Sequence, residues 1–175
     1  MNSMSRGYNY CGRESKKEDR CPVIVKGGCP STVQVPAVTL DVVTPTQITL
    51  ASLTVDASCI CDPVIKIDFT SIYTSLVGLA VSGTTIQIFK QCKNQMSPTP
   101  VGPSWPVSTP IAISLAETKP VSFFVYDNDT CDEGCCTYTA VATVTGIAGA
   151  ALGASYNNST LSALITCKDS CRKCK

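Results

Sequence analysis

The sequence contains no histidine. Histidine is the commonest general base and the commonest neutral metal ligand, so its absence excludes Ser–His and Cys–His catalytic pairs. The 13 acidic residues are scattered singly, and no glycine-rich phosphate loop precedes a helix. The sequence therefore gives no support to catalysis, and we expect a protein that is not an enzyme.

Charge is also scarce, at 15% of the residues, and the formal net charge is +1. Ordinary soluble domains carry roughly 25% charged residues. No long-range field attracts nucleic acid or acidic lipid. No apolar run reaches the roughly 20 residues of a membrane span, and residues 1–20 lack the apolar segment of a secretion signal. We therefore expect no nucleic-acid or membrane partner, no Sec signal peptide, and a surface that packs easily against copies of itself.

Cysteine, in contrast, is abundant, with 12 in 175 residues. This density indicates either disulfides in an oxidising compartment or thiolate-bound metal in a reducing one. A chain of this length with 44% hydrophobic residues can fold on its core alone. Some of the disulfides can therefore serve to join separate chains.

The chain is built from short β-branched segments separated by Pro, Gly, Asn and Ser, many with alternating apolar and polar residues, which is typical of strands. Strands are expected at 21–26, 32–35, 37–43, 47–55, 63–69, 76–81, 84–90, 111–115, 121–127, 137–145 and 161–167. Residues 97–103 contain three prolines and are expected to form a loop. No segment shows a capped helical period. We predict an all-β fold, a jelly-roll-like two-sheet β-sandwich.

Three regions are expected along the chain. Residues 1–20 are polar and highly charged after Glu14, and form an N-terminal connector arm. Residues 21–167 form the β-sandwich domain, and residues 168–175 form a cysteine-containing C-terminal tail.

Three motifs could hold a metal, and each has a simpler explanation. Cys167, Cys171 and Cys174 have the C-x3-C-x2-C spacing of iron–sulfur sites, but no barrel follows them. Cys-x-Cys and Cys-Cys pairs suit disulfides to different partners better than one zinc ion. The acidic segment 127–134 lacks the Gly and Glu of a calcium loop and is expected to form a turn. We predict no metal and no cofactor.

Several segments together resemble a clostridial cysteine-rich family of domains of unknown function (DUF4489-like). They are residues 21–30, 59–69, 87–94, 100–105, 122–127 and 135–139. In general character the chain is similar to the subunits of bacterial endospore appendages, which are cysteine-bearing jelly-roll proteins with an N-terminal connector. That resemblance implies an extracellular location on the spore surface. Subunits made inside a sporulating mother cell need no export signal.

From these observations we predict a structural subunit that self-assembles by strand augmentation into a disulfide-cross-linked, pilus-like extracellular fibre, with copies of itself and an anchoring protein as partners. The interchain disulfide candidates are Cys11, Cys21, Cys29, Cys167, Cys171 and Cys174. The intradomain disulfide candidates are Cys59, Cys61, Cys92, Cys131, Cys135 and Cys136.

Two other functions remain open. One is a non-fibrous, cysteine-rich spore coat protein that binds metal through thiolates. The other is a carbohydrate-binding jelly roll, with Trp105 and either Tyr73 or Tyr126 as stacking platforms.

Overall fold

The computed structural model describes residues 22–35, 45–58, 60, 62–75, 81–93, 95–108, 117–128, 135–147 and 154–168. All regular structure within these residues is β. The nine strands are β1 (Ile24–Gly27), β2 (Ser31–Val35), β3 (Thr46–Asp56), β4 (Pro63–Ser75), β5 (Val81–Cys92), β6 (Thr99–Ser108), β7 (Glu117–Asp127), β8 (Cys135–Ile147) and β9 (Ala154–Cys167).

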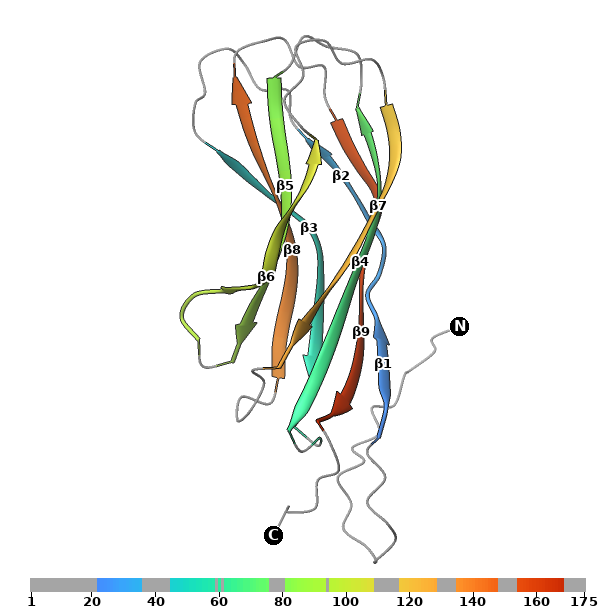
Figure 1. Cartoon of the computed structure of the whole chain (residues 1–175), viewed down its shortest axis with the longest axis vertical. Coiled ribbons are helices and arrows are strands. Elements are labelled where there is room, and N and C mark those ends of the chain that lie inside the picture. The colour runs from blue at the N-terminus through green and yellow to red at the C-terminus, as the bar shows by residue number, and fades with distance from the viewer. Residues whose placement is uncertain are drawn as a thin grey trace, which may run out of the picture.

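The strands form two sheets that pack face to face (Figure 1). In sheet A, β1 and β2 both pair with β9, and the order continues through β4 to β7. Sheet B has the order β3-β8-β5-β6. Every pairing is antiparallel. Consecutive strands from β2 to β5 alternate between the sheets, as in a jelly roll. The predicted all-β two-sheet sandwich is confirmed.

Alternation of side chains explains why these segments become strands. In β4, Ile65, Ile67 and Phe69 are at most 1% exposed, while Lys66 and Asp68 between them are half-buried on the outer face. Successive side chains of a strand point to opposite faces, so one apolar face is available to each sheet.

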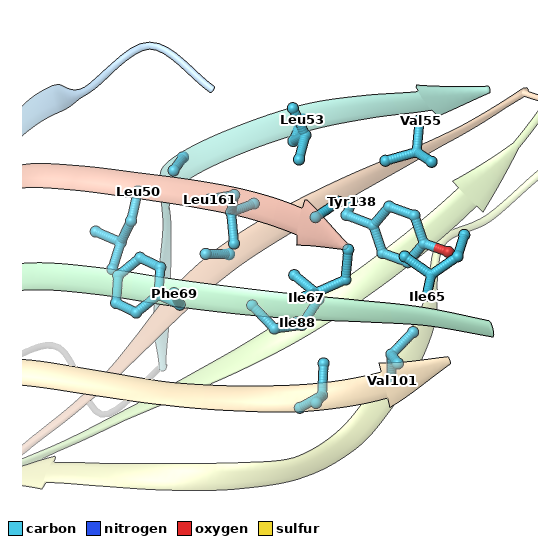
Figure 2. Packing of buried hydrophobic residues seen from close by; sticks show 14 of the residues in the cluster. Leu50, Leu53, Val55, Ile65, Ile67, Phe69, Ile88, Val101, Tyr138 and Leu161 are labelled. Atoms are coloured by element: carbon cyan, nitrogen blue, oxygen red, sulfur yellow. The ribbon is translucent and has the colours of Figure 1, made fainter. Parts of the chain in front are cut away.

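The two inner faces meet in one apolar layer, which Figure 2 shows from close by. Its largest fully buried side chains are Tyr138, Tyr156 and Phe69. Phe69 packs against Phe123 of β7 with ring centroids 5.2 Å apart. Burying one large apolar side chain contributes about 1.5–3 kcal/mol, so this layer is the main stabilising element of the fold.

The prediction of a loop at residues 97–103 is wrong, because residues from Thr99 onward belong to β6. β6 is the edge strand of sheet B, where a proline without an N–H can be tolerated on the side that faces away from the sheet. The β5–β6 pairing also shifts register twice, and Gly102 between these prolines has a φ of 71°. Trp105 of the same strand stacks on Phe123 at 5.3 Å.

Some sequence predictions fall outside the described residues. They include the strands expected at 37–43 and 111–115, most of the strand expected at 76–81, and residues 129–134 of the turn expected at 127–134. The N-terminal arm, residues 1–20, and the tail from residue 169 onward are also outside them. The described strands run from Ile24 to Cys167.

One disulfide joins two neighbouring strands of sheet B. Cys92 ends β5 and lies opposite Cys136 of β8, and the two are bonded across a sequence separation of 44 residues. Both side chains are buried, at 3% and 4% exposure. A loop of this length gives a disulfide a typical stabilisation of about 2–4 kcal/mol.

We expect Gly102→Ala to destabilise the fold. An added Cβ would lie 2.7 Å from Cγ1 of Val125, and the φ of 71° disfavours any L side chain. Urea unfolding is expected to show a loss of about 1–3 kcal/mol. Gly27→Ala is the matched control, because a Cβ at Gly27 meets nothing within 4 Å. Equal stabilities of the two variants would contradict the strained position of Gly102.

Removing the disulfide with a Cys92→Ala/Cys136→Ala double variant is expected to lower the free energy of unfolding by about 2–4 kcal/mol. The measurement is a urea titration under non-reducing conditions. Cys29→Ser serves as the control, because Cys29 is exposed and free, and its effect is expected to stay within about 0.5 kcal/mol. An unchanged unfolding midpoint in the double variant would show that this bond does not support the fold.

Candidate assembly surface

An open sandwich has strand edges whose backbone groups can pair with another chain, and proteins that stay monomeric usually block them. In the edge strand β6, prolines at positions 100, 103 and 106 remove three backbone donors. β6 also carries the positive φ of Gly102. These features make β6 a poor template for further strand pairing.

The β3 edge is partly covered by side chains from the β1–β2 segment. Ser31 Oγ donates a hydrogen bond to the carbonyl of Leu50, and Lys26 Nζ lies 3.5 Å from the carbonyl of Thr54. These side chains hold two outward carbonyls of β3 but are themselves half-buried or exposed. A competing strand can displace them, so the cover is weak compared with a proline.

Within the described residues the outer edge of β7 is open, because no described strand pairs with it. β7 contains one proline, Pro120, which lies opposite Ile72 of β4. Proline is tolerated where its missing N–H faces away from the sheet, so the backbone nitrogen of Pro120 faces the open edge. Every second residue of a strand directs its N–H to the same edge, so the N–H groups of Ser122, Phe124 and Tyr126 also face the open edge.

The face beside this edge carries exposed aromatic rings. Phe124 and Tyr126 are 50% and 56% exposed and make an edge-on ring contact at 5.5 Å. Lys66 of β4 lies over the Phe124 ring at 4.7 Å and pairs with Asp68 at 2.7 Å. We call these four residues the aromatic strip. It offers apolar and polar contacts directly next to unpaired backbone groups.

The described cysteines gather mostly at one end of the sandwich, which we call the cysteine end. There β3 ends at Asp56 opposite Cys135, and β9 ends at Cys167 opposite Pro63. The Cys92–Cys136 disulfide lies at the same end, where β5 ends and β8 begins. The sequence segments that follow β2, β4, β6 and β8 contain no cysteine; they are residues 36–45, 76–80, 109–116 and 148–153.

The remaining cysteines lie outside the described residues. In chain order Cys59 and Cys61 fall between β3 and β4, and Cys131 falls between β7 and β8. Cys171 and Cys174 follow β9, and Cys11 and Cys21 precede β1. Their predicted pairings stay predictions.

The chemical states of the described cysteines differ from one another. Cys29 and Cys135 are free and exposed. Cys135 was expected to pair within the domain, but it carries a free thiol here. Cys167 was assigned to the interchain set, yet it is already disulfide-bonded in this single chain. The free thiols, not Cys167, are therefore the described cysteines that can bond to another subunit.

A charged turn borders Cys135. Asp56 accepts hydrogen bonds from Ser58 Oγ at 2.7 Å and from Ser58 N at 3.0 Å. These bonds favour the ionised carboxylate and hold the pKa of Asp56 below its usual value. The cysteine end therefore keeps a negative charge beside the free thiol.

The aromatic residues considered as sugar platforms do not form one surface. Trp105 is 37% exposed and stacks on Phe123. Tyr73 is buried and packs against Tyr156 at 5.2 Å. Tyr126 alone of the three is well exposed, and it belongs to the aromatic strip. Carbohydrate binding therefore gains no support from these positions.

The described residues hold no group of three or more His, Cys, Asp or Glu side chains arranged to bind a metal ion. In the same part of the chain there is no helix of the length and hydrophobicity that a membrane crossing needs.

The solved structures to which this chain is similar include structures of infectious bursal disease virus. The structure of the Gx strain is 12% identical and has a TM-score of 0.32, with 89% of this chain and 43% of that chain covered. The VP2 subviral particle of the same virus is 9% identical with a TM-score of 0.31, with 95% and 45% covered. The chain thus spans less than half the length of these proteins.

Among curated proteins, none matches the sequence of this chain. One family model does match, over residues 21–166, which is most of the chain and includes all nine described strands except the last residue of β9. The chain therefore belongs to the family described as "Domain of unknown function (DUF4489)".

Proposed function

We propose that this protein is a structural subunit that polymerises with copies of itself into a disulfide-cross-linked extracellular fibre, a spore appendage. The observation that carries the proposal is the open edge of β7, flanked by the aromatic strip. A monomeric protein gains nothing from such an edge and would be expected to block it. A subunit that grows by strand augmentation requires it.

The complementary edge in the neighbouring subunit is β3. It has 11 residues and no proline, and the side chains of Lys26 and Ser31 that cover it can move aside. β7 lies beside β6 through the Trp105–Phe123 contact, whereas β3 lies on the other side of the sandwich beside β9 and β2. A contact between two different edges is heterologous, and it repeats into a filament when the rotation does not close.

The aromatic strip adds side-chain contacts to this backbone pairing. Phe124 and Tyr126 lie on the outer face of the open strand, where a neighbouring strand would place its own side chains. Cross-strand aromatic pairs contribute about 0.2–1 kcal/mol each beyond alanine pairs. The strip therefore favours pairing in one register over slipped alternatives.

Covalent bonds between subunits would then lock the fibre. The free exposed thiols of Cys29 and Cys135 are available for this purpose. Cys11, Cys21, Cys171 and Cys174 complete the interchain set that we propose, with Cys11 on the connector arm. Dissociation would require breaking covalent bonds, so the polymer would be kinetically durable. Durability suits a fibre on a spore that persists outside the producing cell.

A second candidate function is a non-fibrous coat protein that binds metal through thiolates. Free, exposed Cys29 and Cys135 favour it, because thiolates bind Zn²⁺. Metal analysis of the native protein separates the two functions. Stoichiometric zinc with unoxidised thiols supports the coat protein, and metal-free, oxidised material supports the fibre.

In electrophoresis of native material with thiols blocked by alkylation, we expect species much larger than one chain without reductant and a single monomer band with it. The reason is that interchain disulfides survive denaturation but not reduction. Migration as a monomer under both conditions would exclude covalent cross-linking between subunits.

We expect Ser122→Pro to prevent assembly while leaving the subunit folded. It removes an N–H that points to the open edge. Pro120, two residues earlier, shows that β7 tolerates a proline whose nitrogen faces this edge. Ser122→Thr keeps the N–H and serves as the control. The measurements are light scattering of the oxidised protein and circular dichroism of the subunit. Polymerisation of the proline variant at the rate of the threonine variant would exclude the β7 edge from the interface.

A further inference from the structure

A buried ion pair spans the layer between the two sheets. Lys90 Nζ lies 3.1 Å from Oδ2 and 3.4 Å from Oδ1 of Asp127. Tyr138 donates a hydrogen bond to the same Oδ2 at 2.6 Å. The Lys90 and Asp127 side chains are only 7% and 5% exposed. Lysine and aspartate are almost never so fully buried without a specific reason.

The pair comes from different sheets. Lys90 is on β5 opposite Tyr138 of β8, both in sheet B, while Asp127 ends β7 in sheet A. Ile88 precedes Lys90 by two residues and Val125 precedes Asp127 by two residues, and both are at most 3% exposed. Both charged groups are therefore buried beside the apolar layer.

Burial changes the chemistry open to this pair. Two buried charges are costly, and condensation of the ammonium with the carboxylate removes both of them. The pair holds the nitrogen and the carbonyl carbon of an amide within reach of each other. The fold holds the two reacting groups together, and such positioning is equivalent to an effective concentration of about 10⁵ M or more.

We propose that Lys90 Nζ and Asp127 Cγ condense into an amide bond that links β5 and β7 across the sandwich. The amine adds to Cγ, the bond from Cγ to Oδ1 breaks, and Oδ1 leaves as water with two of the three ammonium hydrogens. The third hydrogen stays on the amide nitrogen. The positive and negative charges cancel, so no further reactant is needed.

Tyr138 assists this reaction as a hydrogen-bond donor. Negative charge develops on Oδ2 when the amine adds to Cγ, and the Tyr138 hydroxyl already points to that atom at 2.6 Å. Burial, followed by the contact with Asp127, raises the pKa of Tyr138 well above its usual value. The hydroxyl therefore stays protonated and can donate this hydrogen bond throughout the reaction.

A second lysine–aspartate pair provides an internal comparison. Lys66 and Asp68 are closer, at 2.7 Å, but their side chains are 30% and 35% exposed. Water solvates both charges there, so no burial cost favours their removal by condensation. We expect no bond between them.

The amide bond would be independent of assembly, since it forms within one subunit. It would hold together the two sheets at the strand that carries the open edge, and reductant would not break it. The Cys92–Cys136 disulfide, which lies within sheet B, cannot do this.

The test is peptide mass spectrometry of the full-length protein after reduction, alkylation and digestion with trypsin and Glu-C. The additional cleavages after Glu117 and Glu133 give the linked peptides a mass that no uncleaved linear segment has. We expect a branched peptide joining the segments that contain Lys90 and Asp127, with the combined mass minus one water and no cleavage after Lys90. Separate peptides of full mass, with cleavage after Lys90, would overturn the proposal. A water loss located at other residues would overturn it as well.

Variants define the chemistry further. Asp127→Asn is expected to form the same link with loss of ammonia in place of water, whereas Asp127→Ala is expected to leave Lys90 unlinked. Tyr138→Phe is expected to lower the linked fraction at a given time after synthesis at least several-fold. A fully linked Tyr138→Phe protein at the earliest time would contradict the role given to that hydroxyl.

Discussion

Contact between the inner faces of the two sheets is the interaction on which the rest of the structure depends. Each sheet is marginal alone, because half of its side chains are apolar and need cover. Tyr138, Tyr156 and Phe69 occupy the layer between the sheets, and the strands are long enough to make that layer continuous. With stability supplied by this layer, the cysteines are available for tasks other than folding. Their concentration at one end of the sandwich fits that division of roles.

The same architecture creates the constraint that connects fold to function. A sandwich that does not close into a barrel must leave edges, and this chain treats its edges differently. Of three of these edges, β6 is blocked by prolines, β3 is covered by the side chains of Lys26 and Ser31, and no described strand pairs with the outer side of β7, beside exposed Phe124 and Tyr126. An asymmetry of this kind favours head-to-tail growth over symmetric pairing. The low charge of the chain removes a repulsion that would oppose such growth.

The fold class could be predicted from alternating side chains, since strand periodicity is a local property. The β6 error had a physical cause: prolines exclude a central strand, but whether a segment becomes an edge depends on distant pairing. The Lys90–Asp127 pair was missed as well, although a signal existed. Lys90 continues the inward series Ile86, Ile88 in a strand, where a charge is out of place. Disulfide pairing could not be derived, because sequence spacing does not determine which strands become neighbours.

The most direct measurement is electron cryo-microscopy of the native assembly, alkylated at harvest and resolved well enough to trace strands. The account predicts a filament in which β7 of one subunit continues the sheet into β3 of the next, with Phe124 and Tyr126 covered at the contact. Density for a covalent bridge between subunits would be expected at Cys29 or Cys135. Isolated subunits, or a filament whose β7 edges remain unpaired, would contradict it.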